Sequence, residues 1–162
     1  MKKYQTQLHI PGLFKLYIKT TSKRTKILMQ SQTSKIYTKD LPRTTQILKK
    51  FLPSIFNCEC FNYNNHSFSE EVKNTELGHL FEHMLLEFLC LKKIEEGKRD
   101  AMFEGRTSWN WKKDKSGTFY IDINAGKNDF SIFNDALIKS ITLVKAIVLN
   151  TQTGGQINHL LD

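Results

Sequence analysis

The sequence predicts an α+β fold, a single domain in which a mixed or antiparallel sheet packs against two long helices. Three observations predict it: alternating apolar and polar residues in the first forty positions, two apolar segments of helical length near 75–97 and 130–149, and a hairpin pattern between them. The length of 162 residues suits one domain. We assign residues 1–150 to this domain and expect residues 151–162 to form a mobile tail.

The N-terminal part is expected to contribute strands and one short helix. Residues 8–20 alternate around a Pro11-Gly12 turn, and residues 25–30 and 35–38 have the composition of further short strands. A helix is predicted over residues 42–52, where it meets Pro53. Residues 54–74 are polar and asparagine-rich, and we expect them to be irregular.

The helix after this segment is the clearest element. Asn74 or Thr75 is a plausible N-cap, Gly97 ends the apolar run, and apolar residues lie nearly all round the helix, which predicts burial. Residues 101–111 and 117–124 read as the two strands of a hairpin, and a second long helix is predicted from Phe130 to Leu149.

The net charge of +8 is unevenly distributed. Residues 1–50 hold twelve Lys and Arg against one acid, Asp40, which gives +11 for this part. Such asymmetry can mark a nucleic-acid surface, but the sequence has no nucleic-acid-binding motif. We therefore interpret the charge as a solvated basic face and do not expect nucleic acid as a partner.

The N-terminal residues and the cysteines predict the localisation. Two lysines come directly after Met1, without an apolar run of signal-peptide or membrane-span length. The three cysteines, Cys58, Cys60 and Cys90, are an odd number without a secretory disulfide pattern. We expect a cytoplasmic protein with reduced thiols and no membrane interaction.

The residues that carry chemistry are His79, Glu82 and His83, in the order H-x-x-E-H. Positions i and i+4 of a helix lie one turn apart on one face, so both imidazoles can reach one metal ion, with Glu82 beside them as general base. The alternative is a pair of core histidines satisfied by hydrogen bonds. A buried helix makes unpartnered polar groups costly, which favours the metal, and we expect zinc.

A catalytic zinc site needs a third protein ligand. Glu87 is excluded, because it lies eight positions after His79, a rise of about 12 Å along the helix. Asp135, at the start of the second long helix, is the first choice. Cys60 and Cys58 come next, although both can equally be ordinary thiols.

Four blocks of the sequence resemble the N-terminal domain of cyanophycin synthetase. They are L-P-S-I-F-N-C-E-C at 52–60, T-E-L-G-H-L-F-E-H-M-L-L-E-F at 75–88, F-E-G-R-T at 103–107 and G-T-F-Y-I-D-I at 117–123. Together they cover most of residues 41–150. Cys58 stands where the family usually has His. The H-x-x-E-H helix is also similar to that of pitrilysin-type metallopeptidases.

The resemblance implies a zinc-dependent hydrolase of amide or isopeptide bonds, acting on a peptide or an arginine–aspartate polymer. Zinc would activate water, Glu82 would move the proton, and Arg106 would clamp a substrate carboxylate or form a structural salt bridge. The alternative is a non-catalytic module that binds the polymer or docks a separate synthetase. The expected partners also include a second copy of this chain, which would form a homo-oligomer.

Overall fold

The computed structural model describes residues 4–60, 66–98 and 102–149 and confirms the α+β fold. Its sheet has five strands in the order β1-β2-β3-β5-β4, and every pair of neighbours is antiparallel. The strands are β1 (Thr6–Ile10), β2 (Phe14–Thr20), β3 (Thr25–Ser31), β4 (Gly105–Ser108) and β5 (Thr118–Ile123). The predicted hairpin is present as β4 and β5, and β5 joins it to the N-terminal strands.

Four α-helices and three short 3-10 helices complete the described chain. They are η1 (Thr38–Asp40), α1 (Thr44–Phe51), η2 (Pro53–Asn57), α2 (Phe68–Glu71), α3 (Leu77–Glu95), η3 (Lys127–Asp129) and α4 (Phe130–Leu149). The two long helices α3 and α4 are the two that the sequence predicts. The predicted tail, residues 151–162, lies outside the described residues.

Three local predictions are wrong. Residues 35–38 do not form a strand, because Tyr37 makes one isolated bridge to Glu76 and the chain then turns into η1. The segment 54–74, expected to be irregular, contains η2 and α2. The N-cap of α3 is Glu76. Thr75 instead donates its backbone N–H to the Thr38 hydroxyl, and its carbonyl accepts a hydrogen bond from the Thr38 N–H.

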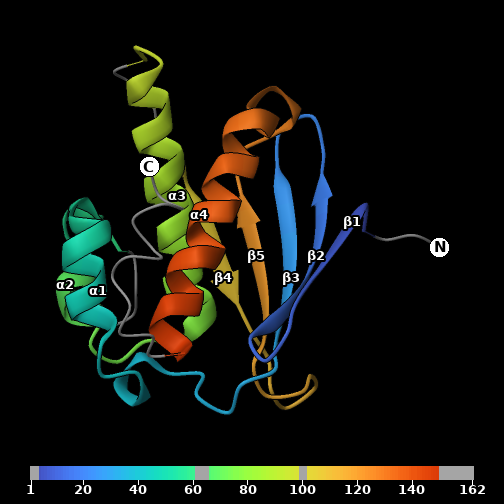
Figure 1. The fold of residues 1–162 in the computed structure, drawn as a ribbon. Helices are drawn as coiled ribbons and strands as arrows, with labels where there is room; N and C mark the ends of the chain where they lie inside the picture. The colour runs from blue at the N-terminus through green and yellow to red at the C-terminus, as the bar shows by residue number, and fades with distance from the viewer. Residues whose placement is uncertain (1–3, 61–65, 99–101, 150–162) are drawn as a thin grey trace.

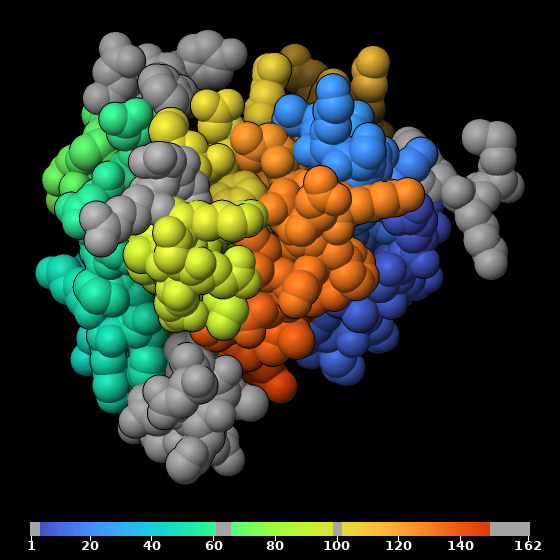
Figure 2. Space-filling model, turned by 90° about the horizontal axis from the view of Figure 1, so that it is seen from above, coloured from blue at the N-terminus to red at the C-terminus, as the bar shows by residue number. Residues whose placement is uncertain are grey.

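The helices cover one face of the sheet (Figure 1). The strands alternate between buried residues that face α3 and α4 and more exposed residues on the other side. Seen from above, α1 and the N-terminal strands lie on opposite sides of the molecule, with α4 between them (Figure 2). No described helix covers the second face, which we call the open face.

Close contact between α3 and β5 depends on a glycine in the first turn of the helix. A Cβ atom built on Gly78 would lie only 2.3 Å from Cγ of the fully buried Phe119. The turn of α3 that carries Gly78 and His79 can therefore lie directly against β5.

Among the described residues, no helix combines the length and the apolar character that a membrane span requires.

Candidate metal centre

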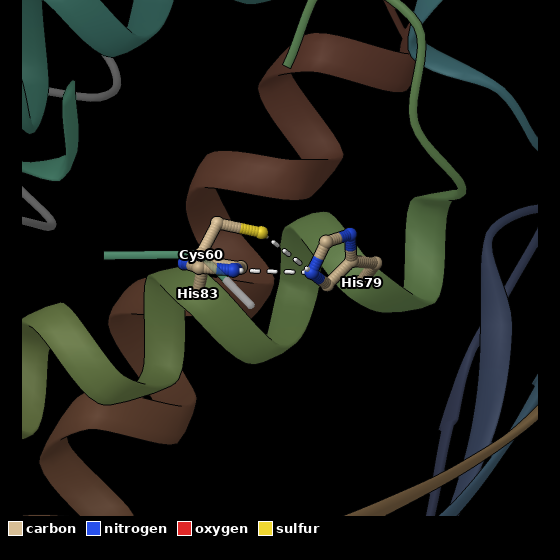
Figure 3. A group of neighbouring side chains, drawn as sticks. All are labelled: Cys60, His79 and His83. Atoms are coloured by element: carbon tan, nitrogen blue, oxygen red, sulfur yellow. Dashed lines mark hydrogen bonds between the residues drawn. The ribbon is translucent and has the colours of Figure 1, made fainter. Parts of the chain in front are cut away.

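Helix α3 brings two imidazole rings together, as the H-x-x-E-H spacing predicts. Nε2 of His83 lies 3.1 Å from Nε2 of His79, and the ring planes meet at 70°. Both side chains point to the same side of the helix (Figure 3).

A third donor reaches the two rings from a different part of the chain. Cys60 follows η2, and its Sγ lies 3.6 Å from Nε2 of His79 (Figure 3). One donor atom from each of these residues lies within 4.8 Å of the other two, so we call them the Cys60/His79/His83 cluster. Within the described residues, no other such group of His, Cys, Asp and Glu is found.

The donor set fits tetrahedral zinc. Zinc–nitrogen and zinc–sulfur bonds of ordinary length imply about 3.3 Å between two ligating nitrogens and about 3.6 Å between nitrogen and sulfur. Two of the three separations, 3.1 Å between the two nitrogens and 3.6 Å between Sγ of Cys60 and Nε2 of His79, are close to these values, and the third is within 4.8 Å. Imidazole and thiolate ligands are also the donors that zinc favours.

A hydrogen-bond relay orients His79 for metal binding. The Thr75 hydroxyl lies 2.8 Å from Nδ1 of His79 and donates its own hydrogen to the Glu76 carboxylate, at 3.4 Å. The Thr75 oxygen can therefore accept a hydrogen bond from Nδ1–H. In that tautomer the lone pair of Nε2 points toward the other two donors. Histidine ligands in protein zinc sites are usually oriented in the same way, by a hydrogen bond from the ring nitrogen that does not bind the metal.

His83 is buried and stacked on a phenylalanine. The centroid of its ring lies 4.1 Å from the centroid of the Phe68 ring, and the two ring planes are inclined by 23°. Nδ1 of His83 has no hydrogen-bond partner among the described residues. Burial, with a smaller effect from His79, lowers the pKa of His83 to about 3. Burial also lowers the pKa of His79. Both rings are therefore neutral near pH 7, the state in which imidazole binds metal.

Glu82 lies between helix α3 and β4, the strand at the edge of the sheet. Its side chain is buried, and its carboxylate accepts a hydrogen bond from the Thr107 hydroxyl on β4. Gly105 leaves room for it, because a Cβ atom there would lie 2.9 Å from Oε1 of Glu82. Burial raises the pKa of Glu82 to about 7, against the opposing effect of the Thr107 hydrogen bond. A carboxylate with this pKa can exchange protons near neutral pH.

The structure does not bring Asp135 into the cluster. Its Oδ2 lies 3.5 Å from Nζ of Lys139, one turn further along α4, and its side chain is 41% exposed. Cys60, the second choice, occupies the third position instead. Cys58 is also outside the cluster: its thiol donates a hydrogen bond to Glu87 at 3.1 Å, and burial together with this bond raises its pKa.

The structure also does not bring Arg106 to the cluster. Along β4 the side chains alternate, so Thr107 faces Glu82 while the exposed Arg106 lies on the open face, opposite Asp122 of β5. An arginine on this face is separated from the two histidines by the sheet itself.

Sequence reasoning missed three residues that shape the centre. Phe68, Thr75 and Thr107 stack on His83, orient His79 and bind Glu82, respectively. The spacing of Thr75, four residues before His79, was a usable signal, although it suggested a helix cap. Phe68 and Thr107 come from segments distant from His83 and Glu82 in the sequence, so no spacing pattern pointed to them.

Comparison with known families agrees with this architecture. The model of the family described as cyanophycin synthase-like N-terminal domain matches residues 26–148, from β3 almost to the end of α4. A search of curated proteins finds no match. The match includes all three residues of the cluster as well as Glu82. With about three quarters of its length matched, the chain belongs to the cyanophycin synthase-like N-terminal domain family.

Proposed function

We propose that this chain is a zinc-dependent hydrolase of amide or isopeptide bonds. One observation carries the proposal: Cys60, His79 and His83 present one thiol and two neutral imidazoles to a common point. Three protein ligands leave the fourth zinc position for a water or a substrate, which is the arrangement of catalytic rather than structural zinc sites.

When bound, zinc would supply Lewis-acid activation of water and of the scissile carbonyl. Glu82 would accept a proton from the attacking water and pass it to the leaving amine. Thr107 would hold the Glu82 carboxylate in place through its hydrogen bond. The H-x-x-E-H order, similar to that of pitrilysin-type metallopeptidases, supports this assignment of the base. Arg106 takes no part, because it lies on the open face.

Family membership supports a substrate related to the arginine–aspartate polymer. The bond attacked would be an amide or isopeptide linkage within that polymer or in a related peptide. Hydrolysis breaks the carbon–nitrogen bond, adds hydroxyl to the acyl carbon and leaves the nitrogen as an amine.

The test is release of amines from arginine–aspartate polymer by zinc-loaded protein. We expect turnover with the natural chain and a loss of at least about 100-fold with Glu82→Gln, which keeps the shape of the side chain but cannot accept the proton. Glu95→Gln, an exposed change near the end of the same helix, is the matched control and should leave the rate unchanged. Turnover by Glu82→Gln equal to that of the natural chain would contradict the role of the base.

One observation favours the alternative of a non-catalytic module that binds polymer or docks a synthetase. The Glu82 carboxylate is already engaged by Thr107, and its oxygens are not among the atoms of the metal cluster. This alternative predicts an intact fold with no bound metal and no product release, together with retention of the protein on immobilised polymer.

A further inference from the structure

The open face carries charged and aromatic side chains in rows that run across the strands. Strand register places residues of neighbouring strands side by side, so side chains far apart in the sequence form continuous lines. Three such lines cross the face. The proposed hydrolase site uses none of them, since it lies on the other side of the sheet.

The middle row has an aromatic and apolar centre between the polar residues Gln7 and Ser108. Tyr17 of β2 pairs with Leu28 of β3, and Leu28 pairs with Tyr120 of β5. Tyr120 is 39% exposed, and Tyr17 and Leu28 are half-buried. With strands about 4.8 Å apart, the two tyrosine rings are carried on backbones separated by about 10 Å.

One outer row consists mainly of cations. On one side, Lys19 pairs with Lys26, Lys26 with Asp122, and Asp122 with Arg106. Arg24 extends this row, because its Nε lies 2.7 Å from Oδ1 of Asp122.

On the other side of the middle row, Lys15 pairs with His9 and Gln30. A depression of about 160 Å³ lies here, lined by Lys15, Gln30, Ser31, Gln32, Lys115 and Thr118. Its two lysines and polar neighbours suit a phosphate group.

The charge of the face is strongly positive. Six cations belong to its rows and its depression: Lys15, Lys19, Arg24, Lys26, Arg106 and Lys115. Two acids lie among them. Asp122 is paired with Arg24, and Asp114 accepts a hydrogen bond from the Tyr120 hydroxyl.

We propose that the open face binds single-stranded nucleic acid. Two tyrosines lie between a cation-rich row on one side and Lys15 with Lys115 on the other. This arrangement matches the two parts of such a ligand, because bases stack on aromatic rings while phosphates follow the positive charge. An acidic polypeptide would satisfy the cations but has no groups that need the tyrosines. A duplex hides the faces of its bases in the stack and so leaves the tyrosines unused as well.

The test is binding of short fluorescein-labelled oligothymidylate to the full chain at low salt, measured by anisotropy. We expect saturable binding that weakens as salt rises. Tyr17→Ala should reduce affinity at least about 5-fold, and Tyr17→Phe, which keeps the ring, should restore it. Lys19→Gln combined with Lys26→Gln should lower the slope of log affinity against log salt by about 1.4.

The matched control removes the same charge from a different surface. Lys49→Gln combined with Lys50→Gln changes two exposed lysines of α1, far from the open face, and should leave the slope unchanged. His83→Ala should bind oligothymidylate as the natural chain does, so this proposal stands or falls independently of the zinc site. Thermal unfolding of each variant verifies that it is folded.

Three results would overturn the proposal: absence of oligothymidylate binding at low salt, equal losses in the α1 control and the sheet variants, or full affinity in folded Tyr17→Ala. Polyaspartate that competes as well as oligothymidylate, with no effect of the tyrosine, would also overturn it and would assign the face to acidic polypeptides.

Discussion

The two faces of the sheet carry different kinds of chemistry. The buried face holds Glu82, His79 and His83 on one helix, where burial shifts pKa values and fixes tautomers. The open face holds cations and tyrosines from four strands, where water screens each charge. A single substitution should therefore change stability or metal affinity strongly on the first face, whereas on the second face a single substitution should have a smaller effect.

The largest effect is expected where the buried face is packed most tightly. Gly78→Ala would drive a methyl group into Phe119, and we expect the free energy of unfolding to fall by about 3 kcal/mol. Chemical denaturation measures it. Adding Phe119→Leu to Gly78→Ala should recover part of the loss, since it removes ring atoms from the clash. A substitution at Gly78 without any cost would show that α3 does not approach β5 as described.

A pH-dependent effect of similar size is expected from Glu82 in chelator-treated protein. Burial raises the pKa of its carboxyl from 4.5 to about 7, so the folded state holds a proton that the unfolded state has already lost. Stability therefore falls as pH rises from the unfolded value through the folded one, by up to about 3 kcal/mol. Glu82→Gln should flatten this decline.

Urea unfolding at pH 5 and pH 8 measures this effect. The natural chain should lose stability between the two values relative to Glu82→Gln. Neutral His83 acts in the opposite direction at lower pH: its depressed pKa means that stability is lost as pH falls below its unfolded value of 6.5. An identical pH dependence of the two chains would show that the Glu82 carboxyl is not desolvated.

An intermediate effect is expected from the residue that orients His79. Thr75→Val keeps the size of the side chain but removes the oxygen beside Nδ1 of His79. We expect zinc affinity to fall by about 10- to 100-fold, the usual effect of losing a second partner. Thr75→Ser retains the hydroxyl and should retain most of the affinity. Competition with a chromogenic chelator measures both, and equal affinities would remove Thr75 from the centre.

The smallest effect is expected on the open face. Asp122→Asn breaks the pairs with Arg24 and Lys26, whose side chains are largely exposed, so the free energy of unfolding should change by less than about 1 kcal/mol. The same variant should bind oligothymidylate more tightly, because it removes an acid from a basic row. A large loss of stability would show that the two faces do not differ as described.

The sequence was most informative where the relevant residues are close along the chain. Alternation and apolar runs predicted both long helices and the hairpin. The spacing of His79 and His83 predicted that their rings meet, because helical geometry relates positions i and i+4 directly. Cys60 could be ranked only behind Asp135, since its approach to α3 depends on how η2 packs. The face on which Arg106 lies could not be predicted, because strand alternation decides it and the exact start of β4 was not predicted.

The rows of the open face could not be predicted from the sequence either, because their members are far apart along the chain. Tyr17 and Tyr120 are over one hundred positions apart, and only the register of β2, β3 and β5 makes them members of one row. Because the sequence does not reveal that row, the positive charge of the first fifty residues was interpreted as a solvated basic face. Antiparallel register cannot be derived from strand composition alone when both faces contain polar residues.

The proposed function depends above all on one zinc ion held by Cys60, His79 and His83, and metal content by mass spectrometry is the decisive test. The natural chain, loaded with zinc and then desalted, should contain one zinc per molecule. Cys60→Ala and His83→Ala should lose it while remaining folded, and Asp135→Asn should keep it, since Asp135 pairs with Lys139 instead. A natural chain without zinc, or zinc that persists in both Cys60→Ala and His83→Ala, would refute the three-residue site.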